Sequence, residues 1–154
     1  MSFNRLLKAL DRYIESGEID RPVRAQIGYS EYSPRHYSGH SFFPPDEFKQ
    51  LFQNAEVVVT HAGGGIISSC LQEGKKLVVV PRLKKFHEHT NDHQMELARE
   101  IKERRLARVV YDTVNLPAAI QGALREEAPA KRKKQHYRMR RLVERYLNNL
   151  EKDR

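Results

Sequence analysis

The fold is decided by the stretch Glu56-Val57-Val58-Val59-Thr60-His61-Ala62-Gly63-Gly64-Gly65-Ile66-Ile67, which leads to a second apolar run at Leu77-Val78-Val79-Val80. Three valines without alternation are typical of a strand covered on both faces, as in a parallel sheet. Three glycines and a segment with helical apolar spacing separate this run from the second one. Strand, glycine turn, helix and strand make one βαβ unit. Its right-handed crossover places the glycine turn at the carboxyl edge of the sheet.

The glycine turn suggests an anion site. Bare backbone N–H groups and the positive end of a helix dipole favour a phosphate there. His61 stands at the carboxyl end of the strand, where side chains face the ligand crevice. The turn is neither GxGxxG nor a Walker P-loop, since no Lys follows the glycines. Two structural alternatives stay open: the glycines serve only positive φ or close packing, and His61 is a hydrogen-bonded core residue.

The remaining chain supplies the other elements of an α/β domain. Apolar spacing predicts helices over 3–14, 46–55, 92–105 and 116–124, and strands over 22–28, 41–43 and 108–111. We expect Ser2 or Asn4 to cap the first helix, and Asp46 to cap the second. The chain starts at the edge of a helix, whereas a doubly wound domain normally begins with a strand.

Length and composition indicate a single cytoplasmic domain. The 154 residues suffice for one core. With one cysteine no intramolecular disulfide forms, which fits a reducing compartment. No apolar run approaches the roughly 20 residues that span a bilayer, and the first residues lack the apolar region of a signal peptide.

The positive charge is concentrated near the C-terminus. Residues 131–154 contain ten Lys or Arg and three acidic residues, which accounts for +7 of the net +8. We expect a Rossmann-like domain over 1–127 and a basic amphipathic helix over 128–154. Three interpretations of this tail stay open: it lies on an anionic membrane surface through 131–147, it docks on a partner or on its own core, or it binds nucleic acid. Nucleic acid is the least favoured, because no RRM, KH or helix-turn-helix signature occurs.

A second polar cluster, His87-Glu88-His89-Thr90-Asn91-Asp92-His93-Gln94, follows the second apolar run. These side chains include metal ligands, but nothing resembles HExxH, and we expect no metal. A solvated loop is one alternative. The other is a loop beside the glycine turn whose carboxylate and amide groups bind sugar hydroxyls. Phosphate and hydroxyl binding together suit a nucleotide-sugar.

These motifs resemble family 28 glycosyltransferases. The likeness rests on Thr60–Ile67, Gly74-Lys75-Lys76, Val80-Pro81-Arg82 and Glu88–Gln94, and it extends from about Phe3 to about Leu124. Within the family the chain is similar to the small donor-binding subunit of two-component enzymes. Those include bacterial polysaccharide pairs and the eukaryotic pair that adds the second N-acetylglucosamine to a dolichol-linked acceptor. The resemblance implies the C-terminal half of a GT-B fold that binds a UDP-sugar, with no tightly bound cofactor, and a separate membrane-anchored subunit that supplies the acceptor half.

The resemblance also implies roles for individual residues. The backbone of Gly63, Gly64, Gly65 and Ile66 would hold the diphosphate, with His61 and Arg82 beside it. Phe43 and Pro44 would line the uracil site, and Asn91, Asp92 and Gln94 would reach the donor sugar or order the loop. The possible pocket edge consists of Gln26, Gly28, Tyr29, Glu88 and His89.

Two departures from the family pattern concern the donor site. Family members usually place an acidic residue at the position of Ser69, where it grips the ribose hydroxyls; a neutral serine makes a weaker hydrogen bond. Members also begin with a strand and a Gly-Thr turn ahead of the first helix, which would correspond to residues before Ser2. Either the chain is truncated or its start is misassigned, or another segment or subunit fills that place.

The resemblance therefore implies a subunit for inverting transfer of a sugar from UDP to a lipid-linked saccharide, peripheral at the cytoplasmic membrane face. Its part would be to position the donor and stabilise the leaving diphosphate. No catalytic residue is assigned, because the general base is expected on the acceptor subunit, and the isolated chain is expected to turn over negligibly. A scaffold subunit without donor binding and a nucleic-acid-binding module are the alternatives.

Overall fold

The computed structural model describes residues 2–131, 141 and 145. Its helices are α1 (Asn4–Glu15), α2 (Pro45–Asn54), α3 (Gly64–Glu73), α4 (His93–Glu103) and α5 (Leu116–Arg125), with short 3-10 helices η1 (Lys84–Phe86) and η2 (Thr113–Asn115). Its strands are β1 (Arg24–Gln26), β2 (Ser38–His40), β3 (Val57–Thr60), β4 (Lys76–Val79) and β5 (Arg108–Val109). The α/β class predicted from the sequence is confirmed.

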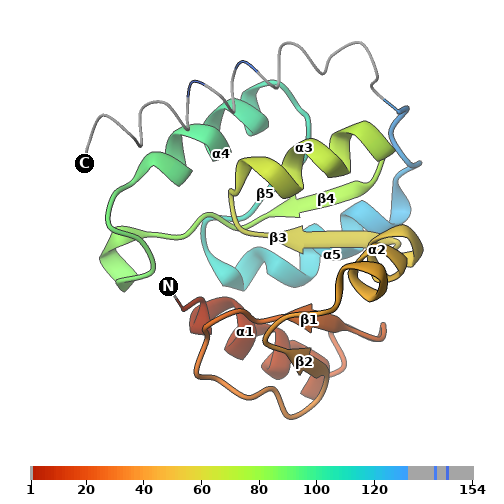
Figure 1. Ribbon diagram of the computed structural model, residues 1–154, viewed down its shortest axis with the longest axis vertical. Coiled ribbons are helices and arrows are strands. Elements are labelled where there is room, and N and C mark those ends of the chain that lie inside the picture. The colour runs from red at the N-terminus through yellow and green to blue at the C-terminus, as the bar shows by residue number, and fades with distance from the viewer. Residues whose placement is uncertain (1, 132–140, 142–144, 146–154) are drawn as a thin grey trace.

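The strands form two parallel sheets. β3, β4 and β5 make a three-stranded sheet in that order, and Val57 of β3 pairs with Lys76 of β4. β1 and β2 make a separate two-stranded sheet in which Ala25 pairs with Gly39. Within the described residues no ladder joins the two sheets. In Figure 1, α3 and α4 lie on one side of the three-stranded sheet and α5 lies on the other, with α1, β1 and β2 beyond it.

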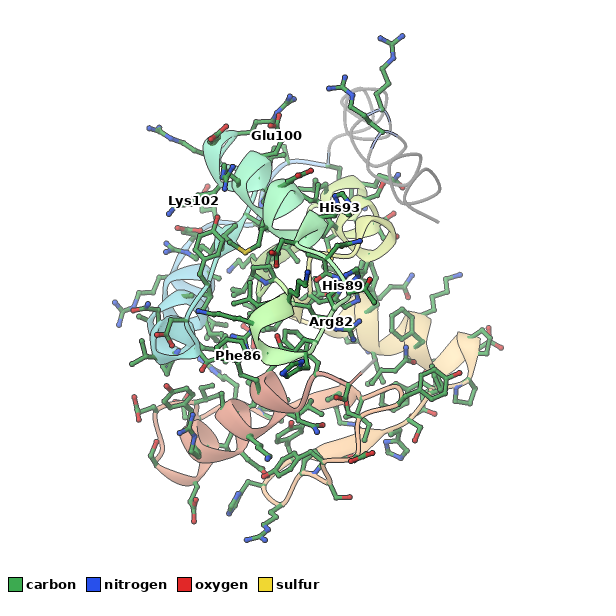
Figure 2. The ribbon with its side chains drawn as sticks, turned by 90° about the vertical axis from the view of Figure 1, so that its left-hand side faces the viewer. Arg82, Phe86, His89, His93, Glu100 and Lys102 are labelled. Atoms are coloured by element: carbon green, nitrogen blue, oxygen red, sulfur yellow. The ribbon has the colours of Figure 1, made fainter. Side chains whose placement is uncertain are left out.

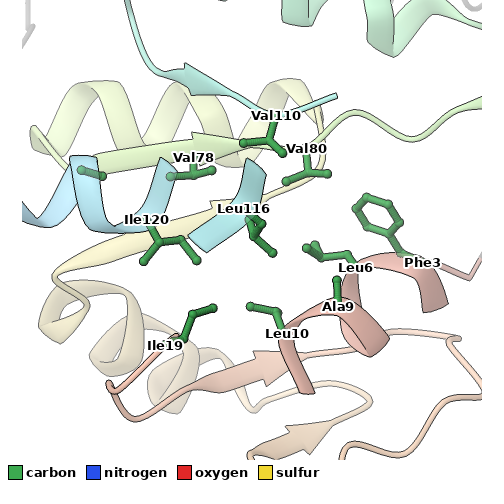
Figure 3. Close-up of a cluster of buried hydrophobic side chains, with 11 residues drawn as sticks. Phe3, Leu6, Ala9, Leu10, Ile19, Val78, Val80, Val110, Leu116 and Ile120 are labelled. Atoms are coloured by element: carbon green, nitrogen blue, oxygen red, sulfur yellow. The ribbon is translucent and has the colours of Figure 1, made fainter. Parts of the chain in front are cut away.

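The unbroken apolar run of β4 is explained by a core on each face of the sheet. Val78 and Val80 belong to a cluster with α1 and α5, which Figure 3 shows. Leu77 and Val79 point to the opposite cluster, built from α3 and α4. Successive side chains of a strand alternate between faces, so a strand buried on both faces must be apolar throughout. The βαβ unit predicted from residues 56–80 is present.

The strand expected at 41–43 is wrong. β2 ends at His40, and the Phe43 N–H donates 3.0 Å to the Gln26 side chain instead of continuing a ladder. Both expected caps are also wrong. Phe3 is the N-cap residue of α1, and Asn4 is already in the helix, where its side chain accepts from the Tyr32 N–H. The N-cap residue of α2 is Pro44, and Asp46 lies in the first helical turn, where its charge still favours the helix dipole.

The chain after α5 passes the end of α3. Gly74 ends α3 with φ +66°, and a Cβ added there would overlap the Pro129 carbonyl oxygen. Lys131 then forms an ion pair with Glu73 at 3.3 Å. Most of the basic helix expected over 128–154 lies outside the described residues. Among the helices that the structure does describe, none has the length and apolar character needed to cross a membrane.

Candidate functional site

The candidate site residues lie on loops that follow the carboxyl ends of four parallel strands. Gln26 is the last residue of β1 and Gly28 and Tyr29 follow it, whereas Phe43 and Pro44 follow β2. His61 and the glycine turn follow β3, and the loop 82–94 follows β4. This is the edge where ligands bind in open α/β sheets. The structure thereby divides the predicted residues into two groups, one for each sheet.

The glycine turn opens α3. Gly63 is the N-cap residue and provides no side-chain cap, so the N–H groups of Gly64, Gly65 and Ile66 have no partner within the helix. Gly63 is required for a packing reason, because an added Cβ would overlap Cε1 of His61. At Gly65 an added Cβ would meet nothing within 4 Å. The turn therefore presents free backbone donors at the positive end of a ten-residue helix.

A hydrogen-bond chain links the two loops of this group. The Arg82 N–H donates 2.9 Å to Oε1 of Gln94, and Nε2 of Gln94 lies 3.3 Å from Nδ1 of His61. Gln94 is 3% exposed, which makes it one of the few buried polar side chains. Burial and the nearby Arg82 and His89 lower the pKa of His61 to about 4. His61 is therefore neutral at physiological pH.

Arg82 is a partly buried arginine that keeps one unused hydrogen-bond donor. Its Nε is the one buried side-chain atom without a hydrogen-bond partner among the described residues. Burial lowers the pKa of Arg82, which Glu88 opposes. Figure 2 shows Arg82 and His89 near each other, beside the 3-10 helix that bears Phe86. A buried donor without a partner is costly, and Cζ of this guanidinium lies over the Phe3 ring, 5.3 Å from the ring centroid.

Glu88, whose charge raises the pKa of Arg82, makes its own hydrogen bonds to other groups. Arg5 donates to Oε1 at 2.9 Å from Nε and to Oε2 at 3.0 Å from Nη2, and the Leu83 N–H donates to Oε2 at 3.1 Å. Arg5 also donates to the Pro81 carbonyl at 3.0 Å. Glu88 is 4% exposed, so it braces the loop against α1. The role of Arg5 could not be predicted from the sequence, because nothing in the helix around Arg5 indicates a partner 83 residues away.

The polar residues of the loop are used mainly to order it. The Asn91 side chain accepts from the His93 N–H at 3.2 Å, and Asp92 accepts from the Lys84 N–H at 3.3 Å. His89 accepts from the Asn91 N–H, and burial together with Arg82 lowers its pKa. Of the two roles expected for these side chains, the described contacts are those of loop ordering.

The second group is neutral and aromatic. Gln26 holds the Phe43 N–H, and Gly28 turns the chain with φ +58°. Tyr29 is 78% exposed and Phe42 56% exposed, and their rings meet edge to face with centroids 5.3 Å apart. Phe42 was not among the expected site residues. Its exposure could not be read from the sequence, where residues 41–43 resemble a short strand.

A family model described as the glycosyltransferase family 28 C-terminal domain matches residues 2–146. The chain belongs to this family. It is 37% identical over 93 residues to the UDP-N-acetylglucosamine transferase subunit ALG13 of Homo sapiens. The matched segment is 57% of this chain and 8% of the human protein. The subunit of the same name from Mus musculus is 33% identical over 101 residues, 62% of this chain and again 8% of the relative. The chain thus spans a small part of these relatives. No solved structure matches it.

Family 28 membership agrees with the architecture, because parallel sheets flanked by helices are those of the C-terminal half of a GT-B fold. Ser69 is exposed, and its hydroxyl donates to the Gly65 carbonyl at 3.2 Å. A surface hollow of about 580 Å³, lined by Met95, Arg99, Lys102, Glu103 and Tyr111, contains none of the predicted site residues.

Proposed function

We propose that this chain is the donor-binding subunit of a UDP-sugar glycosyltransferase. The observation that carries the proposal is the convergence of two unsatisfied positive features at one sheet edge. These are the uncapped N-terminus of α3 and the Arg82 guanidinium with its unpartnered Nε. A diphosphate supplies the acceptors that both features lack. The aromatic residues after β1 and β2 would accommodate the base, as the family resemblance implies.

The chemical contribution of such a site is to position the donor and to stabilise the leaving group. In inverting transfer an acceptor hydroxyl attacks the anomeric carbon from the face opposite the UDP, and the bond to the diphosphate oxygen breaks. Negative charge then grows on that oxygen, where backbone N–H groups and a guanidinium act as preorganised donors. His61 is neutral and stands with the phosphate-binding groups, so the base that deprotonates the acceptor is assigned to a partner.

That partner, in the proposal, is a membrane-anchored subunit that binds a lipid-linked saccharide at the cytoplasmic face. The names of the relatives support a division of labour, since both are called subunits of a UDP-N-acetylglucosamine transferase. UDP-N-acetylglucosamine is therefore the first donor to test. The purified chain with a lipid-linked acceptor should show negligible transfer, whereas robust turnover would contradict the division.

Calorimetric titration with UDP tests the donor site directly. We expect saturable binding, and Arg82→Gln should weaken it about tenfold or more, the scale of a charge-assisted hydrogen bond. Arg99→Gln is the matched control, because Arg99 is an exposed arginine on α4 and its loss removes the same charge. No heat at millimolar UDP from the folded protein would overturn the proposal and favour a scaffold subunit without donor binding.

A further inference from the structure

The direction of the hydrogen-bond chain between Arg82 and His61 is determined by the backbone. The Arg82 N–H can only donate, so the atom that faces it at 2.9 Å must be the carbonyl oxygen of the Gln94 amide. The amide nitrogen of Gln94 then faces Nδ1 of His61 at 3.3 Å. Because an amide nitrogen only donates, Nδ1 must accept, and the proton of a neutral imidazole is left on Nε2.

We infer that Gln94 is a positioning residue that holds His61 in the Nε2–H tautomer, so that the imidazole presents a neutral N–H donor to the bound ligand. The identity of the ligand as a diphosphate rests on the proposed function. Gln94 acts through His61 and the Arg82 backbone, since both ends of its amide are engaged with protein atoms and its side chain is buried.

The surroundings of His61 keep the ring neutral and in place. The charged or titratable groups that face it are Arg82 and His89, and both disfavour an imidazolium, as does burial. The buried carboxylate of the loop, Glu88, is ion-paired with Arg5. The ring lies against Gly63, where an added Cβ would stand 3.0 Å from Nδ1 and 3.1 Å from Nε2. Nε2 itself has no hydrogen-bond partner among the described residues.

A fixed tautomer matters because the other one would present a lone pair to the ligand. An Nδ1–H imidazole has an acceptor at Nε2, and an acceptor facing a phosphate oxygen is repulsive. Rotation of the Gln94 amide would produce that state, but it would also turn the NH₂ group toward the Arg82 N–H, so that two donors face each other. The backbone N–H therefore determines, through one amide, which ring nitrogen donates.

The tautomer can be read from nitrogen chemical shifts of histidine labelled with ¹⁵N in the full-length protein without ligand. His61→Asn assigns the signal among the seven histidines. We expect wild type at pH 7 to show a protonated Nε2 and an unprotonated Nδ1. Gln94→Glu keeps an acceptor for the Arg82 N–H but turns a carboxylate oxygen toward Nδ1, so Nδ1 should become protonated. Gln50→Glu, the same change at an exposed position on α2, should leave the spectrum unchanged. An Nδ1–H signal in wild type, or an unchanged His61 in Gln94→Glu, would overturn the inference.

A UDP titration of Gln94→Met connects the tautomer to binding. Without the amide, His61 should populate both tautomers, and the affinity for UDP should fall in proportion to the fraction that keeps Nε2–H, which the spectrum measures independently. The two proposals fail separately. Wild type with Nε2–H but without UDP binding would refute the donor site alone, and UDP binding with His61 as Nδ1–H would refute the positioning role alone. If Gln94→Met does not fold, the wild-type and Gln94→Glu spectra still decide.

Discussion

The two halves of the candidate site are held in different ways. The cationic half, which consists of His61, Gly63–Ile66 and Arg82–Gln94, depends on buried hydrogen bonds, and Gln94 and Glu88 are each less than 5% exposed. The aromatic half consists of Gln26–Tyr29 and Phe42–Pro44. It is held by backbone hydrogen bonds, one side-chain hydrogen bond and ring contacts, and two of its aromatic rings are largely exposed.

The difference shows which part of the site is coupled to folding. Buried polar groups need every partner, because an unpaired one costs about 1–3 kcal/mol. Exposed rings cost little to change. Substitutions of the buried polar residues in the cationic half should therefore lower both stability and ligand binding, whereas substitutions of the exposed rings in the aromatic half should lower binding alone. The predictions below test that contrast, from the largest expected change in stability to the smallest.

Glu88→Ala should have the largest effect. It leaves the Arg5 guanidinium, whose side chain is 16% exposed, without its carboxylate and removes the acceptor of the Leu83 N–H. Breaking one side of a buried ion pair typically costs about 3–5 kcal/mol, which chemical denaturation would measure. Glu100→Ala is the control: its ion pair with Arg104 lies on the surface of α4 (Figure 2), so its loss should cost at most about 0.5 kcal/mol. Similar losses of unfolding free energy in both variants would show that the Arg5–Glu88 ion pair stabilises the fold no more than a surface pair does.

Gly63→Ala should come next. The added methyl group would overlap the His61 ring, which must move or displace the start of α3. Overpacking of this kind costs about 1–3 kcal/mol, and UDP binding should weaken because the backbone donors shift. Gly65→Ala adds the same methyl group two residues later in open space, and its stability should match wild type or exceed it. Equal behaviour of the two alanines would contradict the packing role of Gly63.

His61 should make the protein sensitive to mild acid. Burial, Arg82 and His89 lower its pKa in the folded state to about 4, whereas an unfolded histidine titrates near pH 6.5. The unfolded state therefore binds the proton first, and stability falls as the pH drops from 6.5 toward 4. Between pH 7 and pH 5 this loss amounts to about 2 kcal/mol from His61.

His61→Asn isolates that contribution. Asn has no titrating group, so the difference between its unfolding free energies at pH 7 and pH 5 should be smaller than that of wild type. His89, whose pKa is also lowered, is present in both proteins and cancels in the comparison. Asp11 does not interfere with this comparison. Burial raises the pKa of its carboxyl, but hydrogen bonds from Tyr32, Arg35 and His36 lower it by more. The contribution of Asp11 to stability is therefore lost only below about pH 4. Parallel pH profiles would show that His61 is not held neutral by the fold.

Much of the cationic half could be predicted from the sequence because its signal is local. Three valines, three glycines and a second valine run within 25 residues specify a βαβ unit, and topology then brings the 82–94 loop beside the glycine turn. The bracing contacts could not be predicted, since Arg5 and Glu88 are 83 residues apart. The end of β2 was misplaced for a related reason. Ser41-Phe42-Phe43 has strand propensity, but the Gln26 side chain takes the Phe43 N–H. The division of the sheet into two parts also has no local signal.

Tyr29→Ser should have the smallest effect on stability and so tests the contrast from the other side. Tyr29 is 78% exposed, and the described contact of its ring is the edge-to-face contact with Phe42, so unfolding should change by no more than about 0.5 kcal/mol. If the aromatic half receives the uracil, UDP affinity should nevertheless fall about fivefold or more, because stacking of a base on an aromatic ring contributes about 1–3 kcal/mol.

Titration with inorganic diphosphate separates the contributions of the two halves to binding. Diphosphate has no base, so the affinity of the protein for diphosphate should be the same in Tyr29→Ser and in wild type. A fall in stability as large as that of Gly63→Ala would mean that the aromatic half is also coupled to folding. Equal losses for UDP and diphosphate would place the effect of Tyr29 on the phosphate groups.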